Sequence, residues 1–325
     1  MLVRGRRLAR KTLAPNGWIG RLGLAVISIA LLGALALFTD FSSLGTALEQ
    51  GGLALIAIAI ALYLANGLLK AFRWWMLLRA VGVHVSFLRA YGAFLVGMSV
   101  NNLLPGGVAG EPLRLLHLQG KITGNAAGAL TADRVLDAAF LAAAAAAGIP
   151  LLAGLNPDAV GPTIAGVCVL ALLIVVIAGL VWRRWGMDTL ARKPATGAAT
   201  AVLTIPIQLN DAVRLALIAA AYEVQISVWR ALVIVAIGTL AGLIAVLGGG
   251  AGIALTVGAM IGASGADPQT AVAIGLVFVA TSTWLSYPLG ALAALVRAHS
   301  RRRPEEKWSS RWYSLPATRK GTSDS

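Results

Sequence analysis

Cysteine, histidine and acidic residues are scarce in this chain of 325 residues, which contains one Cys, three His and only 13 Asp and Glu. A single cysteine, Cys168, excludes an internal disulfide and a thiolate metal cluster. The histidines His84, His117 and His299 are far apart in the sequence, which argues against a metal site. We therefore expect neither a bound metal nor another cofactor.

The signatures of common enzyme classes are also missing. The sequence has no Gly-x-Ser-x-Gly nucleophile motif, no His-Glu-x-x-His zinc motif and no P-loop for nucleotide phosphates. We therefore do not expect an enzyme. A membrane transferase built on Glu111, Asp133 and Asp137 stays open as an alternative, although the chain has no soluble domain to bind a polar donor.

Apolar residues dominate what is present. Hydrophobic residues make up 58% of the chain, charged residues only 12%, and the mean hydropathy is +0.81. This composition is typical of a polytopic membrane protein, and the continuous apolar runs predict helices rather than strands. The fold class expected is therefore all-α, with about six full spans and two re-entrant helical hairpins. The expected spans cover residues 19–38, 53–69, 135–152, 162–182, 213–245 and 269–296.

The distribution of basic residues predicts the orientation. The net charge is +14, yet the loops 39–52, 153–161 and 246–268 contain no Lys or Arg. These loops are external if the N-terminus is cytoplasmic, as the positive-inside rule requires. We therefore expect a cytoplasmic (inner) membrane protein with both termini in the cytoplasm. The basic charge is explained by orientation and by contact with anionic lipid, so nucleic acid is not an expected partner.

The transmembrane domain is expected to cover residues 19–297. A basic cytoplasmic segment, 1–18, precedes it, and a basic, disordered tail, 298–325, follows it. The segment 213–245 is too long for one upright span, since 33 residues of helix measure about 50 Å. It is tilted, kinked or preceded by an interfacial turn. A version with two shorter spans, using the apolar stretch 195–209, stays open.

Two breaks interrupt the apolar sequence. The first break consists of Pro105, Gly106 and Gly107, and it predicts a re-entrant hairpin over about 88–118. The second hairpin is expected over about 246–264, and similar stretches, "LPGGVAGE" and "LGGGAGI", occupy the two breaks. Two broken segments that enter from opposite faces suggest an inverted repeat, with the transported species near the midplane. The glycines of the second break are Gly248, Gly249, Gly250 and Gly252.

The first break also carries polar residues. Gly110-Glu111-Pro112 is typical of a helix start, and a helix that begins inside the membrane directs unpaired N–H groups and a positive dipole end at an anion such as a lipid phosphate. Asn101 and Asn102 can satisfy broken backbone or bind a headgroup. Arg114 can pair with Glu111 or contact the phosphate. The structural alternative is that Glu111 only caps this helix and pairs with Arg114.

Three further charged groups lie in apolar surroundings. Asp133, Arg134 and Asp137 form either an internal ion-pair network or, through Arg134, a clamp for phosphate. Glu223 and Arg230 are seven residues apart on the segment 213–245, where they would share one helix face as a pathway pair. The third group, Arg73-Trp74-Trp75, is expected to be an interfacial anchor rather than a site.

The order of these residues resembles a known family, the transmembrane region of lysylphosphatidylglycerol synthases and related flippase-like proteins. The resemblance covers roughly residues 50–295. It implies movement of aminoacylated phosphatidylglycerol, polyprenyl-linked lipids or other glycolipids between leaflets, while aminoacyl transfer belongs to a soluble domain that this chain lacks. The residues that carry it are Arg73, Trp74, Asn102, Pro105, Gly110, Glu111, Arg114, Arg134 and Asp137.

The second half departs from the family pattern. Ile253 or a neighbour stands where the family has Glu, and Thr281 or Ser282 stands near its Arg. We therefore expect a translocase for a phosphate-bearing phospholipid or lipid-linked glycan that relies mainly on the first hairpin. Its expected partners are membrane lipids, either anionic phospholipid or polyprenyl-linked lipid. Two alternatives stay open: a transferase for a lipid-linked substrate, or a non-transporting partner of an envelope-lipid enzyme.

Overall fold

The computed structural model describes residues 52–103, 110–119, 123–152, 193–244 and 249–302, and within these ranges the chain forms eight helices and no strand. By length and composition, α4, α10 and the first 31 residues of α13 can cross a membrane. The expected spans 19–38 and 162–182 and the basic segment 1–18 lie outside the described residues. The helices are α4 (Leu53–Ala80), α5 (Phe87–Leu103), α6 (Gly110–Gln119), α7 (Gly124–Leu152), α10 (Pro194–Ala221), α11 (Val228–Ile244), α12 (Gly249–Ala263) and α13 (Pro268–Arg302).

The prediction of one long helix over 213–245 is wrong. Helix α10 contains the apolar stretch 195–209 and continues to Ala221, and α11 begins only at Val228. The chain turns between them because Glu223 adopts a left-handed conformation, with φ of 61°. At the predicted second hairpin, α11 and α12 pack against each other, whereas the predicted range 246–264 covers only α12. The version with two shorter spans agrees with the structure in that two helices cover this region: the stretch 195–209 belongs to α10, which has 28 residues, and α11 follows after the turn.

The C-terminal boundary is also later than expected. Helix α13 continues to Arg302, so the first residues of the predicted tail are helical, and residues 303–325 lie outside the described part. At its other end, Asp267 accepts a hydrogen bond from the backbone N–H of Thr270 at 3.0 Å. This bond is the main reason that the pKa of the Asp267 carboxyl is below its usual value. Asp267 thus caps the start of α13.

The second half of the chain repeats the helices of the first half. Helices α4 and α10 both have 28 residues, and α5 and α11 both have 17. Helices α10 and α11 begin 141 residues after their counterparts α4 and α5, which is also the separation between Lys70 and Asp211. The starts of α5 and α11 match as well: the Arg89 N–H donates to Ser86 Oγ at 3.4 Å, and the Arg230 N–H donates to Ser227 Oγ at 3.2 Å.

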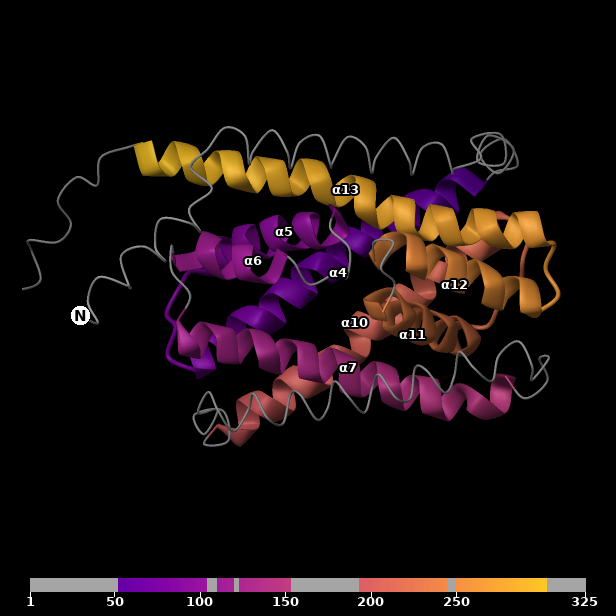
Figure 1. Cartoon of the computed structure of the whole chain (residues 1–325), viewed down its shortest axis with the longest axis horizontal. Helices are drawn as coiled ribbons and strands as arrows, with labels where there is room; N and C mark the ends of the chain where they lie inside the picture. Colours follow the sequence, from indigo (N-terminus) through magenta and orange to yellow (C-terminus); the bar gives the residue numbers. More distant parts are fainter. Residues whose placement is uncertain (1–51, 104–109, 120–122, 153–192, 245–248, 303–325) are drawn as a thin grey trace, which may run out of the picture.

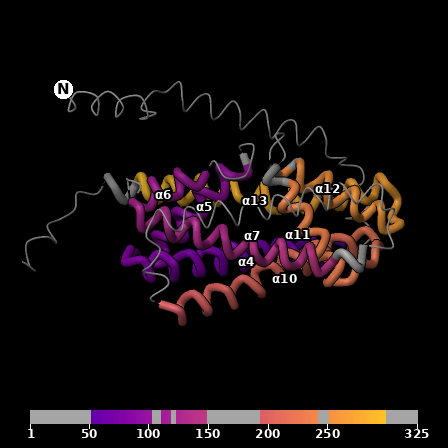
Figure 2. Tube along the Cα trace, turned by 60° about the horizontal axis from the view of Figure 1, so that its bottom comes forward, coloured from indigo at the N-terminus to yellow at the C-terminus, as the bar shows by residue number. Residues whose placement is uncertain are grey.

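The two halves run in opposite directions. As α4 advances from Tyr63 to Arg73, its contacts on α10 move backward from Arg214 to Thr204, so the two helices are antiparallel. Figure 1 shows the same reversal for α7 and α13, which extend along the long axis on opposite sides of the molecule. Figure 2, a turned view, shows α4 and α10 side by side. The described helices therefore have the arrangement of an inverted repeat.

Helices of each half also pack against helices of the other half. Helix α5 of the first half packs on α13, where Ser99 Oγ donates to the carbonyl oxygen of Ser286. Helix α11 of the second half packs on α7, where Gly148 leaves room for the side chain of Val233. Two apolar clusters form the core, one around Trp74 and Leu118 and the other built largely on α10–α13. The contact between halves is therefore made of interleaved helices rather than of one flat interface.

The turn between α4 and α5 and the matching turn between α10 and α11, which we call the two corners, allow a stability test. Gly82 and Glu223 lie 141 residues apart in equivalent turns, and both have positive φ, 82° and 61°. A left-handed conformation costs a residue with a Cβ about 1–2 kcal/mol. We expect Glu223→Gly to stabilise the fold by about 1 kcal/mol and Gly82→Glu to destabilise it by a similar amount, measured by thermal unfolding in detergent. Destabilisation by Glu223→Gly would contradict the repeat of the turn.

Candidate functional site

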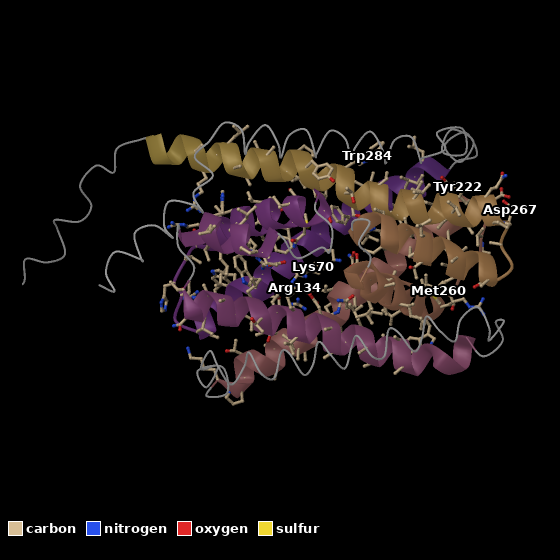
Figure 3. All side chains as sticks on the ribbon, viewed as in Figure 1. Lys70, Arg134, Tyr222, Met260, Asp267 and Trp284 are labelled. Carbon is tan, nitrogen blue, oxygen red and sulfur yellow. The ribbon has the colours of Figure 1, made fainter. Side chains whose placement is uncertain are left out.

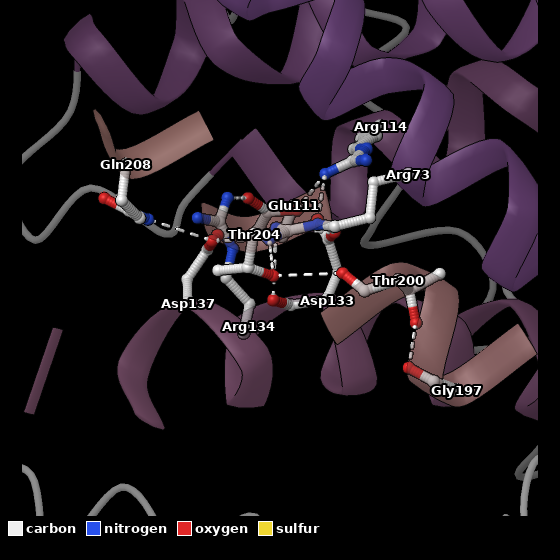
Figure 4. A network of polar contacts seen from close by, with 10 residues as sticks. All are labelled: Arg73, Glu111, Arg114, Asp133, Arg134, Asp137, Gly197, Thr200, Thr204 and Gln208. Atoms are coloured by element: carbon white, nitrogen blue, oxygen red, sulfur yellow. Dashed lines mark hydrogen bonds and ion pairs between the residues drawn. The ribbon is translucent and has the colours of Figure 1, made fainter. Parts of the chain in front are cut away.

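Six charged side chains from three helices, α4, α6 and α7, form a network inside the helix bundle (Figure 4). Three are arginines and three are carboxylates, so their formal charges cancel. Most are buried, whereas the side chain of Arg134 remains 43% exposed. Arg134 lies between the two ends of the molecule, far from Asp267 at one end (Figure 3). The six residues are Arg73, Glu111, Arg114, Asp133, Arg134 and Asp137.

Arg73 of α4 connects the network. Its Nη2 is 2.8 Å from Oδ1 of Asp133, and its Nη1 is 2.8 Å from Oδ1 of Asp137. Nη1 also donates to Thr204 Oγ1 of α10 at 2.9 Å. Because Asp133 and Asp137 are one turn apart on α7, both carboxylates face the same guanidinium. Arg73 thereby joins α4, α7 and α10. The expectation that it is an interfacial anchor is wrong, since its exposed fraction is 0%.

On α6, the carboxylate of Glu111 is contacted by Asn101, Arg114 and Arg134. Its Oε1 accepts a hydrogen bond from Asn101 Nδ2 at 2.8 Å and pairs with Arg134 Nη2, while Arg114 Nη1 lies 3.5 Å from its Oε2. The N–H of Gly110 donates to Asn101 Oδ1 at 2.6 Å. This N–H is therefore not free for an anion, contrary to the sequence-based expectation. The carboxylate of Glu111 itself now occupies the place where several donors converge.

Arg114 is almost completely buried, at 1% exposure. Its guanidinium carbon lies 3.5 Å from the ring centroid of Trp74 and 4.9 Å from that of Phe94, which is cation–π geometry. Nη1 is also 3.6 Å from Asp133 Oδ2. Its Nε and Nη2 have no hydrogen-bond partner in the described part of the chain. Arg114 therefore keeps unused donors behind the Glu111 carboxylate.

A second charged group lies one turn away, between α4 and α10. Lys70 Nζ is 3.0 Å from Asp211 Oδ2, and Arg214 Nη1 is 2.9 Å from Asp211 Oδ1. The Arg214 guanidinium lies over the ring of Phe278, 4.2 Å from its centroid, and its Nη2 donates to the Phe278 carbonyl oxygen at 2.9 Å. The side chain of Lys70 is 30% exposed, whereas Arg214 is buried. This group carries two positive charges and one negative charge.

The structure gathers most residues predicted for the first hairpin. Asn102 lies nearby but donates to Ser286 Oγ at 3.0 Å instead. Those gathered are Asn101, Gly110, Glu111, Arg114, Arg134 and Asp137. Pro105, Gly106, Gly107 and Gly248 lie outside the described residues. Gly249, Gly250 and Gly252 form the start of α12, which contains no charged residue.

Glu223 and Arg230 do not share a helix face. Glu223 lies in the turn after α10, and Arg230 lies in the first turn of α11. The expectation of a pair two turns apart failed because it assumed one continuous helix. The sequence reading also missed Lys70, Asp211 and Arg214. The available signal was the placement of polar residues at intervals of three or four along otherwise apolar helices, as in Asn66, Lys70 and Arg73.

Within the described ranges, no group of three His, Cys, Asp or Glu side chains is arranged to hold a metal ion. The contacts of the network are ion pairs and hydrogen bonds. It can exchange one anionic partner for another at Arg134, where the side chain is accessible. It can also release an arginine if a carboxylate becomes neutral.

Comparison with known proteins agrees with the sequence pattern. Neither the curated proteins nor the solved structures gave a match. The family model of the lysylphosphatidylglycerol synthase TM region matches residues 21–290, which include all of the charged network. The chain therefore belongs to the lysylphosphatidylglycerol synthase transmembrane-region family.

Proposed function

We propose that this protein is a lipid translocase, which binds the phosphate of an amphiphile at the Glu111 end of α6 and moves it between leaflets. The substrate is a phosphate-bearing phospholipid or a lipid-linked glycan. One observation carries the proposal: three arginines and three carboxylates are concentrated inside a bundle of apolar helices. Charges at membrane depth are costly and usually face a substrate pathway.

Headgroup binding would proceed by exchange. The network is neutral without a ligand, so an added phosphate needs an arginine whose present partner can leave. Arg134 meets this need because it is the most exposed of the three arginines and pairs with a single carboxylate, that of Glu111. A phosphate that takes the place of this carboxylate would meet Asn101 and Arg134, with the free donors of Arg114 behind them.

Glu111 is our candidate for the coupling residue. If its carboxylate takes up a proton, the attraction to Arg134 is lost and the arginine becomes available to phosphate. Release of the proton would restore the ion pair and expel the headgroup. Transport would then be driven by the lipid gradient or by protons, and the sequence contains no ATP-binding motif.

We further propose that α5–α6 and α11–α12 are re-entrant hairpins that enter from opposite faces. Their helices have 17, 10, 17 and 15 residues. At about 1.5 Å per residue each reaches about 15–26 Å, short of the hydrocarbon thickness of about 30 Å. The end of the bundle with Arg79, Arg89 and Arg297 would face the cytoplasm, and the end with Glu223 and Asp267 would face outside, in the cytoplasmic membrane.

A panel of fluorescent lipids in proteoliposomes tests the function. The purified chain, in vesicles of phosphatidylethanolamine and phosphatidylglycerol, should speed the exchange of labelled phosphatidylglycerol or polyprenyl phosphate between leaflets. Arg134→Ala and Glu111→Gln should each lower the rate at least about tenfold, which corresponds to 1.4 kcal/mol, because they remove the exchangeable pair. Arg89→Ala, an exposed arginine on α5, is the matched control and should change little.

The proposal is overturned if no lipid of the panel moves faster than in empty vesicles. Size-exclusion profiles of each variant separate loss of transport from loss of fold. If the lipids are chemically altered instead, mass spectrometry would detect new products, and that result favours a transferase. Inert lipids together with a stable co-purifying envelope enzyme would favour the non-transporting partner.

A further inference from the structure

Lys70 and Asp211 occupy equivalent positions in the two halves. They are 141 residues apart, which is the offset between α4 and α10 and between α5 and α11. Their side chains meet, with Nζ and Oδ2 3.0 Å apart. A two-fold axis that exchanges the halves exchanges these two residues. Their point of contact must therefore lie close to that axis.

Contacts on either side of this pair support the same axis. Arg73 donates to Thr204, and Arg214 lies 5.2 Å from the ring centroid of Tyr63. Arg214 is the equivalent of Arg73, and Thr204 is the equivalent of Tyr63, at the same offset. The two contacts are thus images of each other, one above and one below the Lys70–Asp211 pair. The axis passes through the place where α4 crosses α10.

Position on the axis has a consequence for motion. In a transporter built from inverted repeats, the inward-open and outward-open states arise when the two halves exchange conformations. In that exchange a contact between non-equivalent residues is converted into the contact of their two equivalents, whereas a contact between equivalent residues is converted into itself. We propose that the Lys70–Asp211 ion pair is the pivot of this protein, and that it stays closed while the two halves rock about the crossing of α4 and α10.

The charges next to the pivot predict that the two states differ in energy. In the first half, Arg73 pairs with two carboxylates of α7. In the second half, Arg214 meets α13, which contains no Asp or Glu, and relies on Asp211 and the ring of Phe278. The two states that exchange are therefore expected to have different free energies. We expect the state with Arg73 fully paired to be the resting one.

Cross-linking on and off the axis tests the pivot, which rests on the proposed transport function. In a Cys168→Ala background, Lys70→Cys and Asp211→Cys are joined with a short bis-maleimide. The off-axis comparison is a disulfide between Gly92→Cys on α5 and Ala293→Cys on α13. A Cβ at Gly92 would lie 3.9 Å from that of Ala293, which suits a disulfide. Each variant is measured before and after cross-linking with labelled phosphatidylglycerol.

We expect the cross-link at the pivot to leave the rate within about twofold of the uncross-linked variant, and the off-axis disulfide to lower it at least about tenfold. Reduction of the disulfide should restore the rate. The pivot is wrong if the on-axis cross-link stops transport, or if neither cross-link changes it. If the uncross-linked variants and the parent chain all fail to move any lipid, the proposed function fails instead.

Spin-label distances test the pivot without any lipid substrate. One pair of labels is placed at His84 and Pro194, and its repeat equivalent at Gln225 and Leu53, at the opposite end. Rocking about the pivot predicts two distances for each of these pairs and one distance for labels at 70 and 211. A single distance at both ends, or two distances at the pivot, would overturn the proposal.

Discussion

Replacement of Arg73 by alanine should destabilise the fold by about 3–5 kcal/mol, since it leaves buried carboxylates without their counter-charge. Asp133 keeps only the more distant Arg114, at 3.6 Å, and Asp137 keeps the amide of Gln208, at 3.2 Å. A whole domain is stabilised by only about 5–15 kcal/mol. We therefore expect little folded protein, measured as yield and unfolding temperature in detergent.

Arg79→Ala provides the control for this prediction. Arg79 is on the same helix but exposed, and its contact is with the ring of Trp75, 4.9 Å from the centroid. Its loss should cost at most about 1 kcal/mol. A double variant, Arg73→Met with Asp137→Asn, should recover much of the stability, because it leaves two arginines and two carboxylates, so that the network is neutral again. Equal behaviour of Arg73→Ala and Arg79→Ala would show that the network does not hold α4, α7 and α10 together.

In the described part of the first hairpin, the methyl group added by Gly110→Ala should lower the stability of the fold more than a methyl group added at any other position. A Cβ at this position would collide with the carbonyl oxygen of Gly97 on α5 and lie 2.8 Å from Asn101 Oδ1. The first atom is backbone, so α6 would have to move away from α5. Overpacking of this kind costs about 1–3 kcal/mol. The shift would also break the hydrogen bond from Gly110 N–H to Asn101, which positions the donor for Glu111.

The expected result for Gly110→Ala is therefore a lower unfolding temperature together with lost lipid transport. Gly67→Ala is the matched control, since it lies inside α4 and no atom is within 4 Å of its added Cβ. There, alanine should stabilise the helix by about 0.5–1 kcal/mol. If Gly110→Ala behaves like Gly67→Ala, then α5 and α6 are not held in the close contact described here.

The first hairpin could be predicted from the sequence because its signals are local. Helix breakers, a helix-start motif and charged residues occur within fourteen residues, from Asn101 to Arg114. The role of Arg73 could not be predicted in the same way. Its partners Asp133 and Thr204 are 60 and 131 residues away, and nothing near Arg73 in the sequence indicates them. The neighbouring tryptophans favoured an interfacial position instead.

The corner between α10 and α11 was missed for a related reason. In the first half, Gly82 supplies the positive φ of the turn and is a visible signal. In the second half, Glu223 adopts the same conformation, and no Gly or Pro occurs between Tyr222 and Arg230. A continuous apolar stretch therefore concealed a sharp reversal. Comparison of the two halves at the level of whole helices would have revealed it, since both corners end in Ser-x-x-Arg.

The matching corners also bear on the origin of Arg230. It is the counterpart of Arg89 141 residues earlier, and both begin a half-length helix after a serine cap. In the proposed orientation Arg89 is cytoplasmic and Arg230 is external, against the usual bias of basic residues. Duplication of an ancestral segment able to insert in either direction would leave such a residue on the unfavoured side. In that case Arg230 would be retained from the ancestral segment, and the basic residues elsewhere in the chain would set the direction in which each half inserts.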